Sequence, residues 1–163
     1  MSNPLPETED FVLSEAIYRK IVNDLSFFDE RAKDICVRAW DANLKSILDS
    51  ALNKLQVCVL VGSPSMSSID DVSGGAMSMK MEVVIESNAL LKSPSSVGWS
   101  AYDVAGLLRR LLEGYTEADT GCSTPHDELR ITGYKLARNG LNETAQITIS
   151  TIITLNNDET NRK

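Results

Sequence analysis

The sequence predicts an α+β fold, with a mainly antiparallel sheet and helices packed on one face. The first observation is that residues 76–86 and 143–155 alternate apolar and polar side chains, the pattern of strands with one buried face. The second is that residues 42–54 and 101–112 repeat apolar side chains at helical spacing. The third is the element order α-β-α-β-β-α-β-β, in which two strand pairs flank a helix and favour antiparallel hairpins.

The first half of the chain contributes two of the predicted helices. Residues 9–24 carry a stripe of apolar side chains at helical spacing, and residues 34–40 form a short β-prone run. Asp41 is then expected to cap a helix at 42–54, because its carboxylate can accept hydrogen bonds from the first free N–H groups. The continuous apolar run at 56–62 indicates a strand covered on both faces.

The middle of the chain begins with a predicted loop at 63–75, which is rich in serine and glycine. In the strand that follows, residues 76–86, the side chains of Met77, Met79 and Met81 face one way. Three alternating methionines suit either a buried core or a pliable binding surface, and the sequence leaves both readings open.

The segment between this strand and the next helix is unusual, because it holds apolar side chains among loop-forming residues. These side chains are Leu90, Leu91, Val97 and Trp99. They need cover, which either the protein's own core or another copy of the chain supplies. For Trp99, the alternative to a partner is packing toward Val104 as a hydrophobic staple at the start of the helix.

The C-terminal part of the chain predicts a capped helix and a hairpin. Ser100 is a favourable N-cap for the helix. Strands are expected at 127–138 and 143–155, joined through the hairpin-favouring pair Asn139-Gly140.

The 163 residues indicate one domain. Residues 9–155 form the predicted α+β domain, between a flexible N-terminus at 1–8 and a disordered tail at 156–163. The net charge of −7 argues against wrapping nucleic acid or docking on anionic membranes, because both need clustered basic side chains. No apolar run approaches the roughly 20 residues that span a bilayer.

The sequence offers little for catalysis or metal binding. Cys36, Cys58 and Cys122 are too widely spaced for a zinc site, and a reducing cytoplasm suits them. The single histidine, His126, lies beside Asp127 in a loop expected to be exposed. A small enzyme would need this pair in a cleft. The prediction is therefore that the chain is not an enzyme and has no catalytic residues, no metal ligands and no cofactor.

Several motifs resemble those of a known family. The strand ending Val83-Val84-Ile85-Glu86-Ser87-Asn88 is followed by an apolar loop with a glycine, then by Ser100-Ala101-x-Asp103-Val104-Ala105 and Leu111-Leu112-x-Gly114-Tyr115. Over roughly residues 45–155 this layout is similar to the phage tail terminator family of tail-completion or minor tail proteins. That family often has a histidine before the glycine-aromatic pair, where this chain has Glu113.

The resemblance implies a protomer that forms a hexameric ring. Such a ring caps the growing tail tube and joins it to head and neck connector proteins, in a virion assembled in the cytoplasm of the host bacterium. The resemblance implies no enzyme activity and no cofactor. DNA would pass through the lumen without specific recognition, which suits an acidic chain.

The predicted contacts between copies, or with the tube, use the apolar loop and the hairpin tip. The residues are Leu90, Leu91, Val97, Trp99, Asn139 and Gly140. The alternative function is a non-catalytic binding or adaptor module, a monomer or dimer that uses the apolar, methionine-rich face of the sheet.

Overall fold

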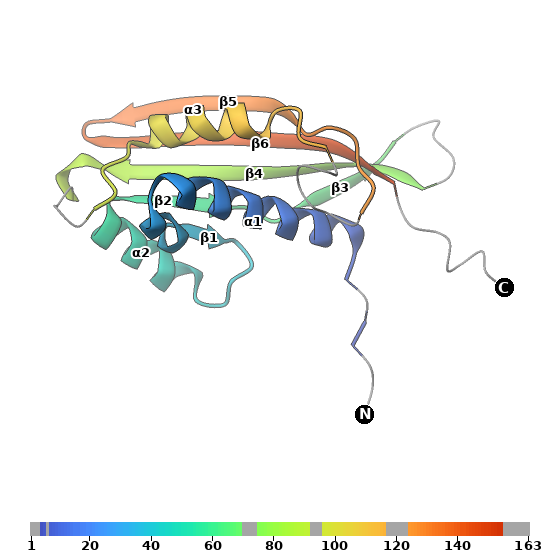
Figure 1. Ribbon diagram of the computed structural model, residues 1–163, viewed down its shortest axis with the longest axis horizontal. Helices are drawn as coiled ribbons and strands as arrows, with labels where there is room; N and C mark the ends of the chain where they lie inside the picture. Colours follow the sequence, from blue (N-terminus) through green and yellow to red (C-terminus); the bar gives the residue numbers. More distant parts are fainter. Residues whose placement is uncertain (1–3, 6, 70–74, 92–95, 117–123, 155–163) are drawn as a thin grey trace.

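The computed structural model describes residues 4–5, 7–69, 75–91, 96–116 and 124–154, which form one sheet with three α-helices (Figure 1). The strand order is β1-β2-β4-β6-β5, and β3 also pairs with β4. The helices are α1 (Glu9–Phe28), α2 (Leu44–Leu55) and α3 (Ala101–Leu112), with short 3-10 helices η1 (Glu30–Asp34) and η2 (Ala89–Leu91). The strands are β1 (Cys36–Arg38), β2 (Val57–Val61), β3 (Ser65–Ser68), β4 (Ala76–Asn88), β5 (Arg130–Asn139) and β6 (Asn142–Thr154).

The α+β class and the mainly antiparallel sheet are confirmed. β4 and β6 form the central antiparallel pair, and β2, β3 and β5 also pair antiparallel with their neighbours. The exception is the pair β1–β2, which is parallel and is connected by α2. A parallel pair needs such a crossover, because a tight turn can only return the chain in the opposite direction.

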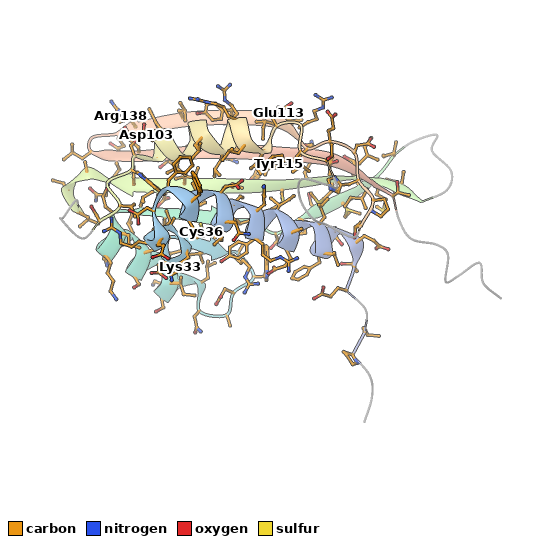
Figure 2. All side chains as sticks on the ribbon, viewed as in Figure 1. Lys33, Cys36, Asp103, Glu113, Tyr115 and Arg138 are labelled. Atoms are coloured by element: carbon orange, nitrogen blue, oxygen red, sulfur yellow. The ribbon has the colours of Figure 1, made fainter. Side chains whose placement is uncertain are left out.

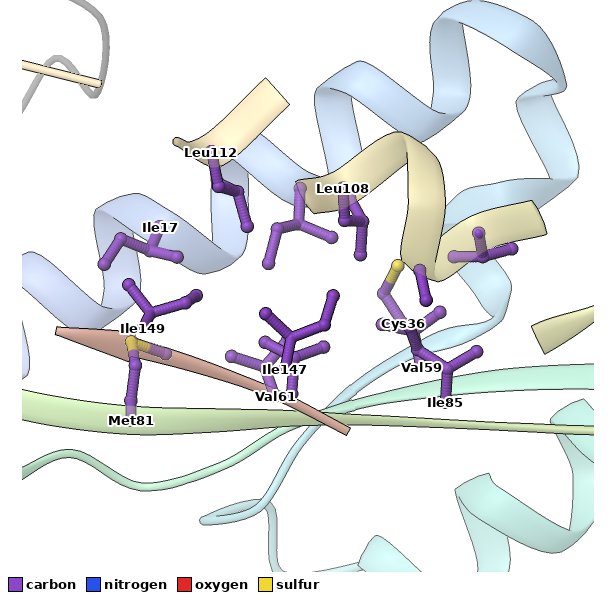
Figure 3. Packing of buried hydrophobic residues seen from close by; sticks show 14 of the residues in the cluster. Ile17, Cys36, Val59, Val61, Met81, Ile85, Leu108, Leu112, Ile147 and Ile149 are labelled. Carbon is purple, nitrogen blue, oxygen red and sulfur yellow. The ribbon is translucent and has the colours of Figure 1, made fainter. Parts of the chain in front are cut away.

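The prediction that all helices pack on one face is wrong for α2. α1 and α3 lie on one side of the sheet, and α2 lies on the other (Figure 3). Alternating residues of β2 face both layers: Val59 belongs to the core beneath α1 and α3, whereas Cys58 is buried on the opposite face. The β1-α2-β2 crossover places α2 over this second apolar face, which would otherwise contact water.

Two further predictions are wrong, one for the loop at 63–75 and one for the cap of α2. Residues 65–68 form an edge strand inside the predicted loop at 63–75, and three serines in four residues carry no apolar alternation to reveal it. Asp41 is not the N-cap of α2, which begins at Leu44. Instead, the Asp41 carboxylate accepts a hydrogen bond from the backbone N–H of Asn43 at 2.9 Å and shapes the turn before the helix.

Other boundaries differ by a few residues. α1 continues past the predicted end at residue 24, and β1 and β5 are shorter than the predicted strands. The predicted cap of α3 is confirmed: Ser100 Oγ accepts from the Asp103 N–H at 3.1 Å, and the Asp103 carboxylate accepts from the Ser100 N–H in return. The predicted tail at 156–163 and residues 1–3 and 6 of the predicted N-terminus lie outside the described residues.

One apolar core lies between the sheet and the pair α1 and α3 (Figure 3). Met81, Ile85 and Ile147 rise from the sheet, and Ile17 and Leu108 close the core from the helices. The rim of the core includes Tyr115, whose hydroxyl donates to Asp24 at 3.0 Å and so ties the end of α3 to α1 (Figure 2). This packing fixes both helices on the sheet.

Candidate interaction surface

The structure brings the predicted apolar loop and hairpin tip together at one end of the molecule. η2 follows β4 directly, and the N–H of Ala89 donates to the carbonyl oxygen of Leu141 at 3.2 Å. Because Asn139 pairs with Asn142, the turn is centred on Gly140 and Leu141, one residue later than the predicted pair. Gly140 has a φ of 63°, a left-handed conformation that glycine adopts without strain.

Exposure divides the apolar loop residues into two groups. Val97 and Trp99 are half-buried and pack against the core. Leu91 is half-buried, but Leu90 is 74% exposed. Leu141, at the hairpin tip, is 52% exposed. The protein's own core therefore covers part of the loop and leaves Leu90 and the hairpin tip open.

Trp99 also lines a small apolar pocket between the end of α1 and the start of α3. The pocket measures about 140 Å³ and is lined by Leu25, Phe28, Trp99, Asp103, Val104 and Leu107. Trp99 and Val104 share this lining, as the predicted hydrophobic staple requires. The pocket therefore joins the end of α1 to the start of α3.

Phe27 and Phe28 add two aromatic rings that the sequence prediction missed. They are 84% and 59% exposed, and their ring centroids lie 5.3 Å apart in an edge-to-face arrangement. The prediction ended the helix at residue 24, although Phe28 keeps the helical spacing from Ile21 and Leu25 and was a usable signal. The name "apolar end" is used below for Phe27, Phe28, Leu90, Trp99 and Leu141.

The hydrogen bonds at this end hold its parts in place. The N–H of Ala101, at the start of α3, donates to the buried Ser87 Oγ at 2.8 Å. This hydrogen bond joins the helix to the end of β4. Arg138 forms an ion pair with Glu143 across the hairpin and lies over the ring of Tyr102 at 5.2 Å. The hydrogen bond to Glu143 is the main cause that raises the pKa of Arg138 above its ordinary value. Charged side chains thus border the apolar end, with Asp103 and Arg138 both near α3 (Figure 2).

The sheet face opposite α1 and α3 is polar beyond the reach of α2. Lys80, Glu82 and Glu86 of β4 are exposed there, and Thr148 and Gln146 of β6 pair beside them. A hollow of about 530 Å³ lies on this face, lined by Ser78, Asp127, Glu128, Arg130, Thr132, Ser150, Thr151 and Ile152. It is a shallow polar depression rather than an apolar ligand pocket.

Two of the three methionines predicted to share one face are core residues. Met79 and Met81 are buried beneath the helices, and Met77 is half-buried at the edge of the described strand. The face that the adaptor alternative relies on is therefore covered in this structure.

His126 is buried, so the prediction of an exposed loop histidine is wrong. Its backbone forms a bridge with Ile153, and its Nδ1 lies 2.6 Å from the carbonyl oxygen of Asp127. This contact joins the ring to the backbone of Asp127 rather than to its carboxylate. Among the described residues, no group of three or more histidine, cysteine, aspartate or glutamate side chains is placed to hold a metal ion.

The two described cysteines are packing residues. Burial raises the pKa of Cys36 to about 12 and that of Cys58 to about 11. Both thiols therefore stay protonated and weakly nucleophilic at neutral pH. Cys122 lies outside the described residues.

Comparisons with known proteins add no assignment. No family model matches the chain, and no curated protein matches it. None of the described helices is both long and apolar enough to cross a membrane. A functional proposal for this chain therefore depends on its own surfaces and on the motifs in its sequence.

Proposed function

We propose that this protein is a structural virion subunit of the phage tail terminator type. It forms a ring of identical copies, a hexamer, that caps the tail tube and joins it to the head or neck. It acts in the virion and assembles in the cytoplasm of the host bacterium. The observation that supports this proposal best is the apolar end, where exposed Leu90 lies beside the exposed hairpin residue Leu141.

The apolar end has the composition of a protein contact. Phe27, Phe28, Leu90 and Leu141 are all more than half exposed, and they come from segments far apart in the sequence. Exposed apolar side chains scattered singly are ordinary, but a group gathered at one end and bordered by charged residues marks an interaction site. Aromatic side chains are also enriched in the centres of such sites.

The acidic chain supports the same function. The net charge of the chain is −7, and acidic side chains facing the lumen of a ring would repel DNA and let it pass without being held. The polar face formed by β4 and β6 is suited to contact with water or with polar partners. The partners in this proposal are other copies of the chain, the tail tube protein and head or neck connector proteins.

The test replaces Leu90 and Leu91 by aspartate. A charged side chain in a closing apolar contact is left without water, so Leu90→Asp with Leu91→Asp is expected to prevent ring formation. Light scattering gives the mass in solution, and negative-stain images of the same sample show whether rings are present. Circular dichroism checks that the variant keeps its fold.

A matched control is Ile152→Asp, which changes a 40% exposed side chain on the polar sheet face. This control is expected to leave the oligomer intact. Rings formed by Leu90→Asp with Leu91→Asp would overturn the proposed use of the apolar end. A wild-type protein that stays monomeric, alone and with tail tubes, would overturn the ring itself and favour a monomeric adaptor.

A further inference from the structure

We propose that the N-terminal arm, residues 4–8, of one copy adds as an extra strand to the free edge of β5 in a second copy. The inference rests on the proposed function only in that copies of the chain associate. It identifies a contact distinct from the apolar end.

The receiving surface is the free edge of the sheet at β5. β5 is the last strand in the sheet order, and its final residues, 135–139, are all exposed. The outer side of a sheet edge presents unpaired N–H and C=O groups that can pair with another chain. Leu136 is 44% exposed on this strand and supplies an apolar contact for an added strand.

The surface of α3 beside this edge is open and lined by paired arginine and tyrosine side chains. The guanidinium of Arg109 lies 5.1 Å from the ring centroid of Tyr134, and that of Arg138 lies 5.2 Å from that of Tyr102. Between Tyr102 and Arg109 on the same side of the helix is Gly106, where an added Cβ would meet no atom within 4 Å. Glycine inside a helix costs about 1 kcal/mol relative to alanine, and nothing in the isolated copy requires it here.

The charge of this surface is opposite to that of the whole chain. α3 and β5 together hold five basic side chains and one acidic side chain, although the chain carries −7 overall. Arg109, Arg110 and Lys135 form no ion pair within the described part of the chain. An extended segment with acidic side chains therefore complements this surface.

The arm has the matching chemistry. Residues 4–8 contain one acidic side chain, Glu7, and no lysine or arginine, and Glu9 and Asp10 follow in the first turn of α1. Leu5 is 90% exposed, and it is the most exposed of the large apolar side chains in the described residues. Leu5 and Glu7 stand two residues apart, so in a strand their side chains share a face, as those of Leu136 and Arg138 do.

The prolines of the arm suit an edge strand with one pairing side. The sequence has proline at positions 4 and 6, and proline has no N–H to donate. In a strand, the N–H groups of Leu5 and Glu7 point to one side, and the proline positions face the other. Proline is tolerated in sheets where its position faces solvent at an edge. The arm can therefore add to β5 without itself offering a new edge.

The arm of a second copy, rather than the arm of the same molecule, fits this position. The described residues before α1, 4–5 and 7–8, lie on the side of the molecule away from β5 (Figure 1). Five extended residues reach at most about 17 Å, too little to turn back around α1. Leu5 is placed opposite Leu136 in either direction of the arm. If the arm runs parallel to β5, Glu7 then lies beside Arg138. If it runs antiparallel, Glu7 lies near Tyr134 and Arg109.

The test is a disulfide between copies. Leu5→Cys and Leu136→Cys are combined in a Cys122→Ser background, in which the remaining cysteines, Cys36 and Cys58, are buried. Mild oxidation followed by a non-reducing gel is expected to give a ladder of cross-linked species up to the full ring. The single-cysteine variants can give dimers at most, and Leu5→Cys with Ile152→Cys is expected to give no ladder.

Charge reversal provides a second test of the contact between the arm and β5. Glu7→Arg is expected to abolish the ladder in the double-cysteine protein. Arg109→Glu restores it if the arm pairs antiparallel, and Arg138→Glu restores it if the arm pairs parallel. A loss that neither arginine variant restores would overturn the assigned surface.

The outcomes separate this inference from the proposed function. An oligomer that forms rings without any cross-link between positions 5 and 136 overturns the arm contact and leaves the ring. Cross-linking that stops at a dimer joined by two exchanged arms keeps the arm contact and overturns the ring. A protein that is monomeric under all conditions overturns both.

Discussion

Cys36 lies in the core beneath α1 with almost no exposed surface, and its surroundings determine its chemistry. Burial makes the thiolate unfavourable and raises the pKa of Cys36 to about 12. Cys58, on the opposite face beneath α2, has its pKa raised to about 11, first by burial and then by the nearby charge of Glu86. Both cysteines lie within apolar runs of the sequence, where small buried residues are common.

These pKa values predict a loss of stability at alkaline pH. The unfolded chain releases its thiol protons near pH 9, whereas the folded chain keeps them up to pH 11 to 12. The thiols therefore contribute fully to stability below pH 9, and this contribution falls as the pH rises from 9 toward 12. Urea denaturation of the Cys122→Ser variant at several pH values measures the effect.

Alkylation provides the control for this prediction. At pH 8, iodoacetamide is expected to modify the folded Cys122→Ser variant slowly and the urea-unfolded variant quickly. Fast modification of the folded protein would contradict the assignment of both thiols to the core.

At the scale of elements, replacing a glycine by alanine is expected to have opposite effects on stability at two positions. A Cβ at Gly106, in the middle of α3, would meet nothing within 4 Å. A Cβ at Gly133, beside the register shift in β5, would lie 2.8 Å from Thr148 Oγ1 of the neighbouring strand. Only the second glycine is required by the packing of the isolated copy.

Gly106→Ala is therefore expected to raise the free energy of unfolding by roughly 0.5–1 kcal/mol, because alanine restricts the unfolded chain and favours the helix. Gly133→Ala is expected to lower it, since Thr148 or the strand must shift. Thermal denaturation of dilute, monomeric protein compares the two variants. Equal shifts in the same direction would contradict these assignments.

The elements also differ in how clearly the sequence predicts them. The capped helix α3 and the alternating strands β4 and β6 were predicted closely, because each has a local pattern that matches its burial. β3 was missed, because a serine-rich edge strand is defined by its pairing with β4 rather than by its own side chains. The continuation of α1 to Phe28 was missed, although Phe28 keeps the helical spacing from Leu25, because both terminal rings are exposed and the core does not define this turn.

At the scale of the whole molecule, exposed apolar side chains gather at one end. The N–H of Ala89, the neighbour of Leu90, donates there to the carbonyl oxygen of Leu141, and Phe27 lies at the end of α1. No single segment shows this concentration. It arises because β4 ends, α3 begins and the β5–β6 hairpin turns at the same edge of the fold (Figure 1).

Phe27→Asp is expected to weaken assembly while leaving the isolated fold intact. Phe27 is 84% exposed, so its substitution changes the free energy of unfolding by no more than about 0.5 kcal/mol. In a contact between copies, the same aspartate loses its water. Light scattering over a concentration series measures association, with Ile152→Asp as the control. Unchanged association would remove Phe27 from the contact.

The sequence by itself determined the α+β class, the core-facing stripes of α3 and β4, and the cap at Ser100. These features follow from local periodicity and from hydrogen bonds between residues close in the chain. Only the tertiary structure decided that α2 covers the second sheet face, that His126 is buried, and that Leu90 stays open while Trp99 is partly covered. Those outcomes depend on which distant segments share a surface, and burial is a property of that shared surface rather than of any one segment.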